Sequence, residues 1–230
     1  MSILAIDIGG GSIKALSIGE DGATVGAPSS ETTPDPARPE AVLGVIERLA
    51  EKVEVYHRVS IGFPGIVKSG VTFNAPNLGN ELWAQVALAA RVEELLGVPA
   101  RAVNDADLQG LGVVEGHGVE LVLTLGTGMG AGLFTRGMLV PNLELGHHPF
   151  RDGHTYEDLV RDTELKRVGA EEWSGRVFDA VVQLEKLFSY DRLHLGGGNA
   201  RHVQRDLPAN VRFFALEDAL QGARRLWDWP

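Results

Sequence analysis

The stretch that most constrains the fold lies at residues 120–134. It reads E-L-V-L-T-L-G-T-G-M-G-A-G-L-F, an apolar run that enters alternating glycines at Gly126, Gly128 and Gly130 and leaves through a second apolar run. This pattern predicts a strand, a tight turn and a second strand. Backbone N–H groups in such a turn can close on a phosphate, and Thr127 adds a hydroxyl. An ordinary hairpin, which needs the glycines only for positive φ, explains the same letters.

The pattern occurs twice. Near the start, L-A-I-D-I-G-G-G-S-I-K-A-L-S-I occupies residues 4–18, and a shift of 117 residues places Gly9 on Gly126 and Gly11 on Gly128. The shift is close to half of the 230 residues, so we expect an internal duplication in which each half opens on a strand–turn–strand unit. Two such hairpins could face each other across a cleft and grip one phosphate chain.

Composition narrows the function classes. The chain is 44% apolar and 23% charged, as soluble globular proteins are, and no apolar run approaches the roughly 20 residues that span a bilayer. The first residues, M-S-I-L, have no basic region, so we expect no signal peptide. The absence of cysteine excludes disulfides and thiolate metal sites, and it fits a cytoplasmic enzyme. A net charge of −10 disfavours a nucleic-acid partner and requires any phosphate grip to be local.

Apolar periodicity and turn residues predict the remaining elements. Strands are expected at residues 23–27, 59–63, 100–103, 192–195 and 211–215. Helices are expected at residues 40–53, 83–96, 106–115, 173–187, 200–205 and 216–227, with two short helical pieces within 152–168. Residues 29–39 contain three prolines and are expected to form a loop.

The tetrapeptide N-D-A-D at residues 104–107 follows a predicted strand. Asp105 could cap the next helix, which is a purely structural role. It could equally act as a general base, because open α/β sheets bind their ligands at the carboxyl ends of strands. The local sequence favours neither role over the other.

Two further patterns, one polar and one rich in glycine, could contribute to a binding site. Glu144 lies close to the adjacent histidines His147 and His148, a combination that suits a polar ligand pocket. A structural metal is disfavoured there, because there is no cysteine and no evident third ligand. A run of three glycines at 196–198 follows a predicted strand. Backbone could approach a ligand closely at this run, or the glycines could form a simple strand-to-helix turn.

These motifs together resemble the ROK family of sugar kinases, and the polyphosphate glucokinase branch in particular. D-I-G-G-G-S-I-K, N-D-A-D, L-G-T-G-M-G, E-L-G-H and L-G-G-G occur in the family's order, and the match extends from residue 3 to about 202. The resemblance implies an α/β chain of duplicated ribonuclease-H-like (actin-like ATPase) domains around a central cleft. We expect one domain at residues 1–104, joined by a terminal helix at about 216–230, and another at 105–215.

The resemblance also implies roles for individual residues in a kinase acting on glucose or a related hexose. Asp105 would be the catalytic base, and Asp7 would assist Mg²⁺ and the phosphoryl group. Phosphate and nucleotide binding would fall to Asp7, Gly9, Gly10, Gly11, Ser12, Lys14, Gly126, Thr127, Gly128, Gly196, Gly197 and Gly198. Sugar hydroxyls would be held by Asn77, Asn104, Asp105, Glu144, His147 and Glu157. The phosphoryl donor would be ATP or inorganic polyphosphate, and the protein a homodimer.

Several positions depart from the family pattern. Gly11 stands where a hydroxyl residue is usual, and the sugar loop at residues 77–83 carries an apparent insertion. The family's cysteine-rich zinc motif is absent, so zinc is not expected, and Glu157 is assigned to the further sugar-binding Glu without a motif around it. A degenerate relative that binds sugar or phosphate without turnover, or a kinase for another acceptor, is therefore an alternative. A DNA-binding sugar sensor is disfavoured, since the first strand follows Met1 at once.

Overall fold

The computed structural model describes residues 2–229 and divides the chain into two compact units. The first comprises Met1–Gly112 and Leu220–Pro230, and the second comprises Val113–Ala219. Residues 1 and 230, which the expected domain boundaries include, lie outside the described residues.

The first unit is built on a five-stranded sheet of order β3-β2-β1-β4-β7. β1, β2 and β3 are antiparallel neighbours, whereas β4 runs parallel to both β1 and β7. The strands are β1 (Ile3–Ile8), β2 (Ser12–Ile18), β3 (Thr24–Thr32), β4 (Arg58–Phe63) and β7 (Ala100–Asn104), with a small ribbon of β5 (Val67–Lys68) and β6 (Val71–Thr72) beside them. The helices are α1 (Pro39–Ala50), the 3₁₀ turn η1 (Asn80–Leu82), α2 (Leu88–Leu96), α3 (Asp105–Val113) and α7 (Leu216–Arg225).

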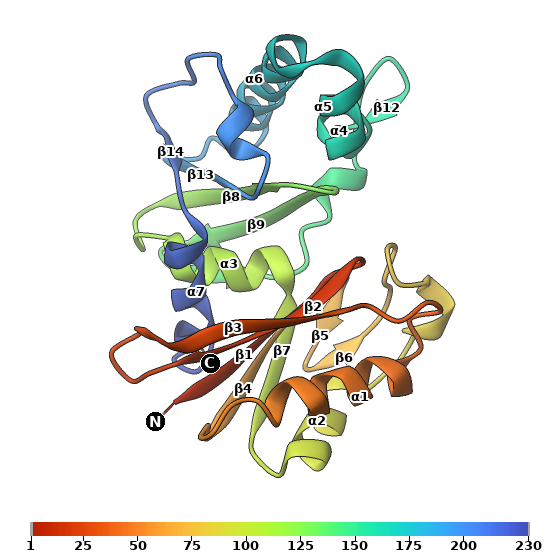
Figure 1. Cartoon of the computed structure of the whole chain (residues 1–230). Helices are drawn as coiled ribbons and strands as arrows, with labels where there is room; N and C mark the ends of the chain where they lie inside the picture. Colours follow the sequence, from red (N-terminus) through yellow and green to blue (C-terminus); the bar gives the residue numbers. More distant parts are fainter. Residues whose placement is uncertain (1, 230) are drawn as a thin grey trace. The chain divides into compact units, whose positions relative to one another are not determined.

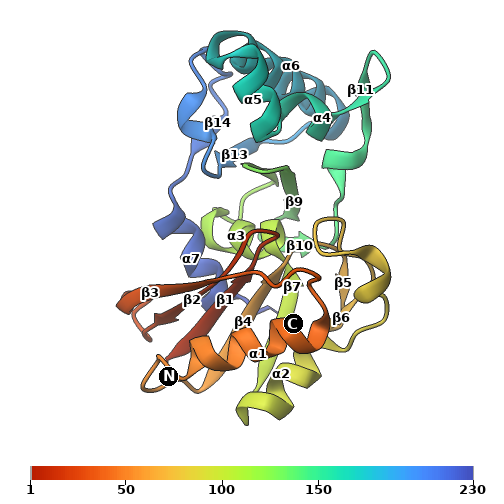
Figure 2. The same ribbon diagram turned by 45° about the vertical axis from the view of Figure 1, so that its right-hand side comes forward.

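Side chains that alternate along β1 pack on opposite faces of this sheet, and different helices cover the two faces. Leu4, Ile6 and Ile8 are fully or almost fully buried in the core that α1 and α2 cover, and Figures 1 and 2 show these two helices on one face. Ile3 instead packs with Ala223 and Trp227 near the C-terminus. Ser60 joins that side by donating to Ala223 O at 2.6 Å, and it accepts from Trp227 Nε1 at 2.9 Å.

The second unit repeats the sheet, in the order β10-β9-β8-β13-β14. Its strands are β8 (Val119–Leu125), β9 (Met129–Thr135), β10 (Met138–Val140), β13 (Arg192–Gly196) and β14 (Val211–Phe213). The other elements are η2 (Leu145–His147), β11 (Pro149–Arg151), β12 (His154–Thr155), α4 (Tyr156–Val160), α5 (Asp162–Val168), α6 (Ala170–Phe188) and η3 (Ala200–His202). Leu121, Leu123 and Leu125 pack against the apolar stripe of α6, whose Trp173 is fully buried and donates to Val160 O at 2.9 Å.

The two sheets confirm the predicted duplication. In each, an antiparallel three-stranded half is followed by two parallel strands, so β1, β2, β3, β4 and β7 correspond to β8, β9, β10, β13 and β14. The first turn spans four residues between the paired Ile8 and Ile13, and the second spans three between Leu125 and Met129. A constant shift of 117 therefore aligns β1 with β8 but does not hold beyond the turn.

Several predicted boundaries were wrong for identifiable reasons. β3 continues to Thr32, because residues 29–32 pair with β2 before the prolines begin. α2 starts at Leu88, not at residue 83, since Gln85 has a positive φ of 61° and Trp83 is fully buried, with Nε1 donating to Ala37 O. The expected helix at 200–205 is only the turn η3, because the N–H groups of Gln204 and Arg205 donate to Ser174 Oγ instead.

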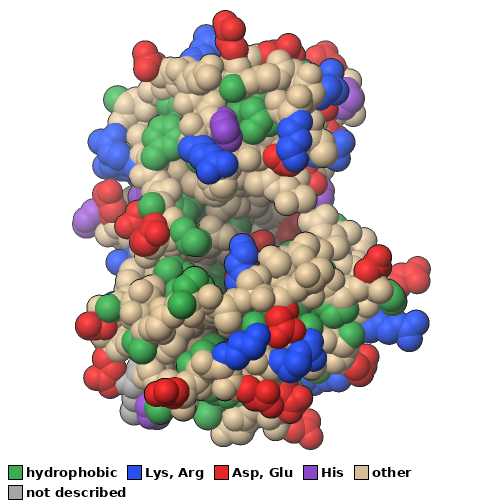
Figure 3. Space-filling view, viewed as in Figure 1, with side chains coloured by type: hydrophobic (Ala, Val, Ile, Leu, Met, Phe, Trp, Pro, Cys, Tyr) green, Lys and Arg blue, Asp and Glu red, His purple; other side chains and the backbone are tan. Residues whose placement is uncertain are grey.

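Across residues 2–229, no helix combines the length and apolar character that crossing a membrane demands. On the face shown in Figure 3, acidic and basic side chains are scattered over both units.

Candidate functional site

The Gly turn of the first unit is held by a residue that the sequence did not single out. Gly9 N donates to Ser12 O at 3.0 Å, and Thr33 donates through Oγ1 to Gly9 O at 2.6 Å and through N to Gly11 O at 3.2 Å. A side chain at position 9 would press on Ser12 O at 2.9 Å, whereas at Gly11 nothing lies within 4 Å. The turn itself therefore requires glycine at position 9, whereas a side chain at position 11 would have space around it.

Asp7 and Lys14 are partners across the β1–β2 hairpin, and their charged atoms lie 3.9 Å apart. Desolvation raises the pKa of the Asp7 carboxyl, while the Lys14 ammonium opposes that shift. The side chain nevertheless keeps 49% of its surface exposed. Asn77 also belongs here, because its Cβ and carbonyl would each lie 3.3 Å from a side chain placed on Gly10. The predicted residues Asp7, Gly10, Lys14 and Asn77 are thus gathered around one turn.

Asn104, and not mainly Asp105, caps the helix α3. Its Oδ1 accepts from Ala106 N at 2.9 Å and from Asp107 N at 3.2 Å, and α3 begins one residue earlier than predicted, at Asp105. Asn104 Nδ2 donates to Gly65 O at 3.3 Å, which leaves its second amide N–H for a ligand. Asp105 Oδ1 accepts from the adjacent Ala106 N at 2.8 Å.

Strand register brings Asp7 and Asp105 to the same edge of the first sheet. Asp7 pairs with Gly62 of β4, and Gly62 pairs with Val103 of β7, two residues before Asp105. A side chain at Gly62 would lie 3.4 Å from Asp105 Cα, so this glycine permits the close approach of α3. Because neighbouring strands are about 4.8 Å apart, the strand that carries Asp7 and the strand that precedes Asp105 are about 10 Å apart.

The Gly turn of the second unit is fixed by a loop and a helix that follow much later in the chain. Gly126 N donates to Gly128 O at 3.0 Å, and Gly126 O accepts from Asp162 N at 3.0 Å and from Asn199 Nδ2 at 3.1 Å. Asn199 N also donates to Leu125 O at 2.9 Å. Asn199 directly follows the run of three glycines, and its hydrogen bonds therefore connect that run to the Gly126–Gly128 turn.

Glu157 lies against this same turn. Its Oε2 accepts from Met129 N at 3.0 Å, and a side chain at Gly128 would collide with the carboxylate. A side chain at Gly146 would lie 3.5 Å from the same oxygen, so η2 also approaches it. The structure thus brings Glu157 beside the segment that carries Glu144 and His147.

Glu144 and His147 form the rest of this polar group. Glu144 Oε2 lies 3.7 Å from His147 Nε2. Burial raises the pKa of the Glu144 carboxyl; His147 opposes the shift, and the nearby Glu157 carboxylate adds to it. His148 is directed elsewhere, with Nδ1 at 3.1 Å from Pro149 O. Within residues 2–229, no three His, Cys, Asp or Glu side chains are grouped so as to hold a metal ion.

The three glycines at 196–198 have different surroundings. A side chain at Gly196 would collide with the ring of Phe214, and one at Gly197, whose φ is 85°, would collide with the backbone of Leu125. Nothing lies within 4 Å on the side of Gly198. Close packing therefore requires glycine at the first two positions, and only at Gly198 is there space for a side chain. Phe214 is a second residue that the sequence did not single out.

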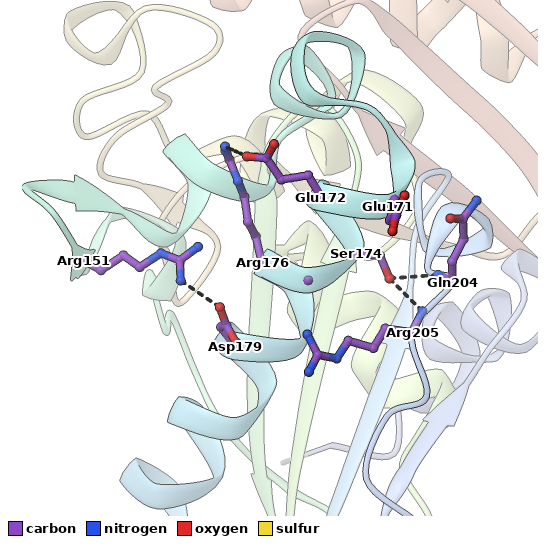
Figure 4. Close-up of a pocket in the computed structure, with 9 residues that line it drawn as sticks. Arg151, Glu171, Glu172, Ser174, Arg176, Asp179, Gln204 and Arg205 are labelled. Carbon is purple, nitrogen blue, oxygen red and sulfur yellow. Dashed lines mark hydrogen bonds and ion pairs between the residues drawn. The ribbon is translucent and has the colours of Figure 1, made fainter.

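A cavity of about 720 Å³ lies in the second unit at the start of α6, and no predicted site residue lines it. Figure 4 shows Arg151 pointing to Asp179 and Arg176 to Glu172, at 2.7 and 2.6 Å. Ser174 Oγ accepts two backbone N–H groups, each at 2.8 Å. Arg151 and Arg176 are thus paired with carboxylates and the Ser174 hydroxyl with backbone N–H groups, so we do not take the cavity as the site.

Comparison with known proteins finds relatives whose names are those of sugar kinases. The chain is 30% identical to the polyphosphate glucokinase of Mycobacterium leprae over 88% of its own length and 65% of that protein. It is 34% identical to the N-acetylmannosamine kinase of Escherichia coli over 69% of its length and 55% of that protein. The crystal structure of an inorganic polyphosphate/ATP-glucomannokinase from Arthrobacter sp. strain KM matches with a TM-score of 0.88 at 29% identity, covering 99% of both chains.

The fold predicted from the motifs, duplicated α/β domains of the actin-like ATPase type, is confirmed by this structural match. The chain spans only 65% and 55% of the two curated relatives, which are sugar phosphotransferases by name. The ROK family model matches residues 3–156, more than half of the chain. This protein belongs to the ROK family.

Proposed function

We propose that the protein is a sugar kinase that transfers a phosphoryl group from polyphosphate or ATP to glucose or a related hexose. The observation that carries the proposal is the register across β1, β4 and β7, which brings Asp7, its Gly turn and Asp105 to one sheet edge. Phosphoryl transfer needs positioned charges more than covalent help. A Gly turn beside one carboxylate suits that task, together with a second carboxylate that follows a strand about 10 Å away.

Asp105 is the general base in this proposal. Its carboxylate orients the attacking sugar hydroxyl and accepts its proton as the hydroxyl oxygen forms a bond to the phosphorus and the bond to the donor oxygen breaks. Asn104 accepts from Ala106 N and Asp107 N and so caps α3, and Asp105 directly follows the carboxyl end of β7, where open α/β sheets bind their ligands. The remaining N–H of Asn104 would bind a neighbouring hydroxyl.

Asp7 would assist Mg²⁺ at the donor phosphates indirectly, through a water molecule of the metal's shell. Magnesium commonly takes one or two carboxylates and completes its shell with phosphate oxygens and water, so a single half-exposed carboxylate beside a Gly turn fits that mode. Bound Mg²⁺ would supply neutralisation of the phosphate charge. Lys14, 3.9 Å from Asp7, adds a positive charge at the same turn.

Glu144, His147 and Glu157 would bind the sugar. Their carboxylate and imidazole groups accept and donate hydrogen bonds to vicinal hydroxyls. Glu157 uses Oε2 to accept from Met129 N, which leaves Oε1 for a ligand and couples the sugar group to the Gly126 turn. An N-acetylhexosamine is the second candidate acceptor, because the E. coli relative is an N-acetylmannosamine kinase at 34% identity. A relative that binds without turnover is the remaining alternative, given the open Gly11.

A coupled assay tests the proposal. Glucose, mannose and N-acetylmannosamine are each supplied with ATP or polyphosphate in the presence of Mg²⁺, and sugar phosphate is measured. We expect turnover on at least one hexose, with glucose the preferred acceptor. No turnover with either donor, together with calorimetric sugar binding, would instead establish the non-catalytic alternative.

A homodimer in the cytoplasm completes the proposal. Its basis is the family resemblance, and light scattering of the purified chain checks the mass against the 24.7 kDa of one copy.

A further inference from the structure

The carboxyl end of β14 carries an aromatic ring beside the glycine run of β13. Leu195 pairs with Phe213, and Phe214 N donates to Leu195 O at 3.1 Å, so Phe214 is the next residue along from that pair, opposite Gly196. A side chain on Gly196 would meet Phe214 Cζ, Cε1 and Cε2 together. The three distances differ by only a few tenths of an ångström, which places the added atom over the face of the ring and not in line with its edge. The ring of Phe214 therefore lies flat on the backbone of Gly196.

This arrangement leaves the other face of the ring directed away from the strand. Phe214 is only partly buried, and its neighbours Phe213 and Leu216 are 57% and 64% exposed. Leu193 and Leu195 of β13 point into the core under α6, so by alternation Gly196 and the ring on it lie on the opposite face of the sheet. A flat, partly open aromatic surface with apolar neighbours suits a planar ligand.

The same edge of the sheet carries the Gly126 turn. β8, β13 and β14 are parallel neighbours, and the turn, the glycine run and Phe214 stand at their carboxyl ends in that order. Ligands of open α/β sheets bind at this edge. β8 and β14 are about 10 Å apart, a separation that the phosphates and ribose of a nucleotide can span. Asn199, which bonds Gly126 O and Leu125 O, links the two ends.

We propose that Phe214 is the stacking platform for the base of a purine nucleoside triphosphate and thereby the residue that determines the use of ATP. The inference rests on the proposed function, in which the Gly126 turn binds donor phosphate. Gly196 then acts through Phe214: it makes room for the ring and does not itself touch the donor. A polyphosphate chain has no base, so it gains nothing from the ring.

Direct binding tests the platform without relying on catalysis. Calorimetry compares Mg²⁺-ATP with inorganic tripolyphosphate for the native chain, Phe214→Ala and Phe214→Trp. Stacking of a base on an aromatic side chain is worth about 1–3 kcal/mol, so we expect Phe214→Ala to weaken ATP by about tenfold or more. Tripolyphosphate binding should change by less than about twofold, and Phe214→Trp should keep ATP binding near native.

Phe213→Ala is the matched control, since this ring lies on the same strand end but is not opposite Gly196. It should leave ATP binding unchanged. Equal loss for ATP and tripolyphosphate in Phe214→Ala would reduce Phe214 to packing, and tighter ATP binding would show that the ring blocks the base. Both outcomes overturn the inference while leaving the kinase proposal intact. If the protein shows no turnover but its ATP binding still depends on Phe214, only the kinase proposal is overturned.

Discussion

The two units share a sheet topology but differ in what stands at the ends of their matching strands. In the first unit, β1 ends near Asp7 and β7 is followed by Asp105; in the second, the matching β8 ends near Thr124 and β14 is followed by Phe214. One duplicated scaffold thus presents carboxylates in one copy and a hydroxyl and an aromatic ring in the other. Under the proposed function this amounts to a division of work, in which the first unit supplies the general base and the carboxylate that would assist Mg²⁺, and the second supplies acidic sugar-binding groups and the stacking ring.

The largest effect expected from this division is at Asp105. Asp105→Asn should lower kcat by about 10²–10⁴, because the amide cannot accept the proton of the sugar hydroxyl. Sugar binding, measured by calorimetry, should change little, since the amide keeps the shape and the contact to Ala106 N could still be accepted. Asp206→Asn, at an exposed position of the second unit, is the control and should be silent. Native turnover in Asp105→Asn would show that Asp105 is not the general base.

A second contrast concerns stability. The shift of 117 aligns Ile3, buried against Ala223 in the first unit, with Glu120, which is 1% exposed in the second. Glu120 accepts from three backbone N–H groups at residues 115–117, and His194 Nε2 lies 2.8 Å from its Oε2. Burial acts to raise the pKa of Glu120, but these donors together hold it below its ordinary value.

Glu120→Gln should therefore destabilise the second unit by about 3 kcal/mol, because the amide is a poor acceptor for converging donors. The depressed pKa means that the contribution of Glu120 is fully present above its unfolded pKa of about 4.3 and is lost as the pH falls through the lower folded value. Urea unfolding at pH 7 and at pH 3 measures both effects, and the difference between native and variant should shrink at pH 3. Glu115→Gln, a half-exposed partner of Arg192, should cost less than about 1 kcal/mol. A difference independent of pH would contradict the assignment to the carboxylate.

A third contrast compares the glycines of the two turns. Gly128→Ala would drive a methyl into the Glu157 carboxylate, so we expect a loss of about 1–3 kcal/mol in stability and a raised KM for the sugar. Gly11→Ala meets nothing within 4 Å and should change stability by less than about 0.5 kcal/mol. Thermal unfolding and sugar titration measure the pair. Equal effects at the two positions would mean that the turns are not specialised.

Sequence reasoning found what is periodic or local. The alternating glycines, the two hairpins and the strand before Asn104 all follow from short patterns, and the repeat predicted the matching sheets. It missed Thr33 and Phe214, because each contacts a glycine more than 15 residues away in the chain. Glu120 looked like the first residue of an apolar run, and its partner His194 lies 74 residues away. Glu157 had no motif of its own; only the folded chain brings its carboxylate to Met129 N.

The smallest expected effect comes from a variant that tests whether the cavity of the second unit takes part in donor binding. If the binding surfaces lie at the carboxyl ends of β8, β13 and β14, the arginines of the cavity at the start of α6 have no part in donor binding. Arg151 pairs with Asp179 while both side chains are about 40% exposed, and such pairs contribute about 0–1 kcal/mol.

Arg151→Met should therefore lower stability by less than about 1 kcal/mol and leave the KM for polyphosphate, ATP and sugar unchanged. Steady-state kinetics with each donor check this, and the matched variant Asp179→Asn, which removes the same ion pair from the other side, controls for packing. A KM for polyphosphate raised severalfold by Arg151→Met but not by Asp179→Asn would show that the free guanidinium binds the polyanion. Donor binding would then extend from the strand edge to the first turns of α6, and the division between the two units would have to include this second surface.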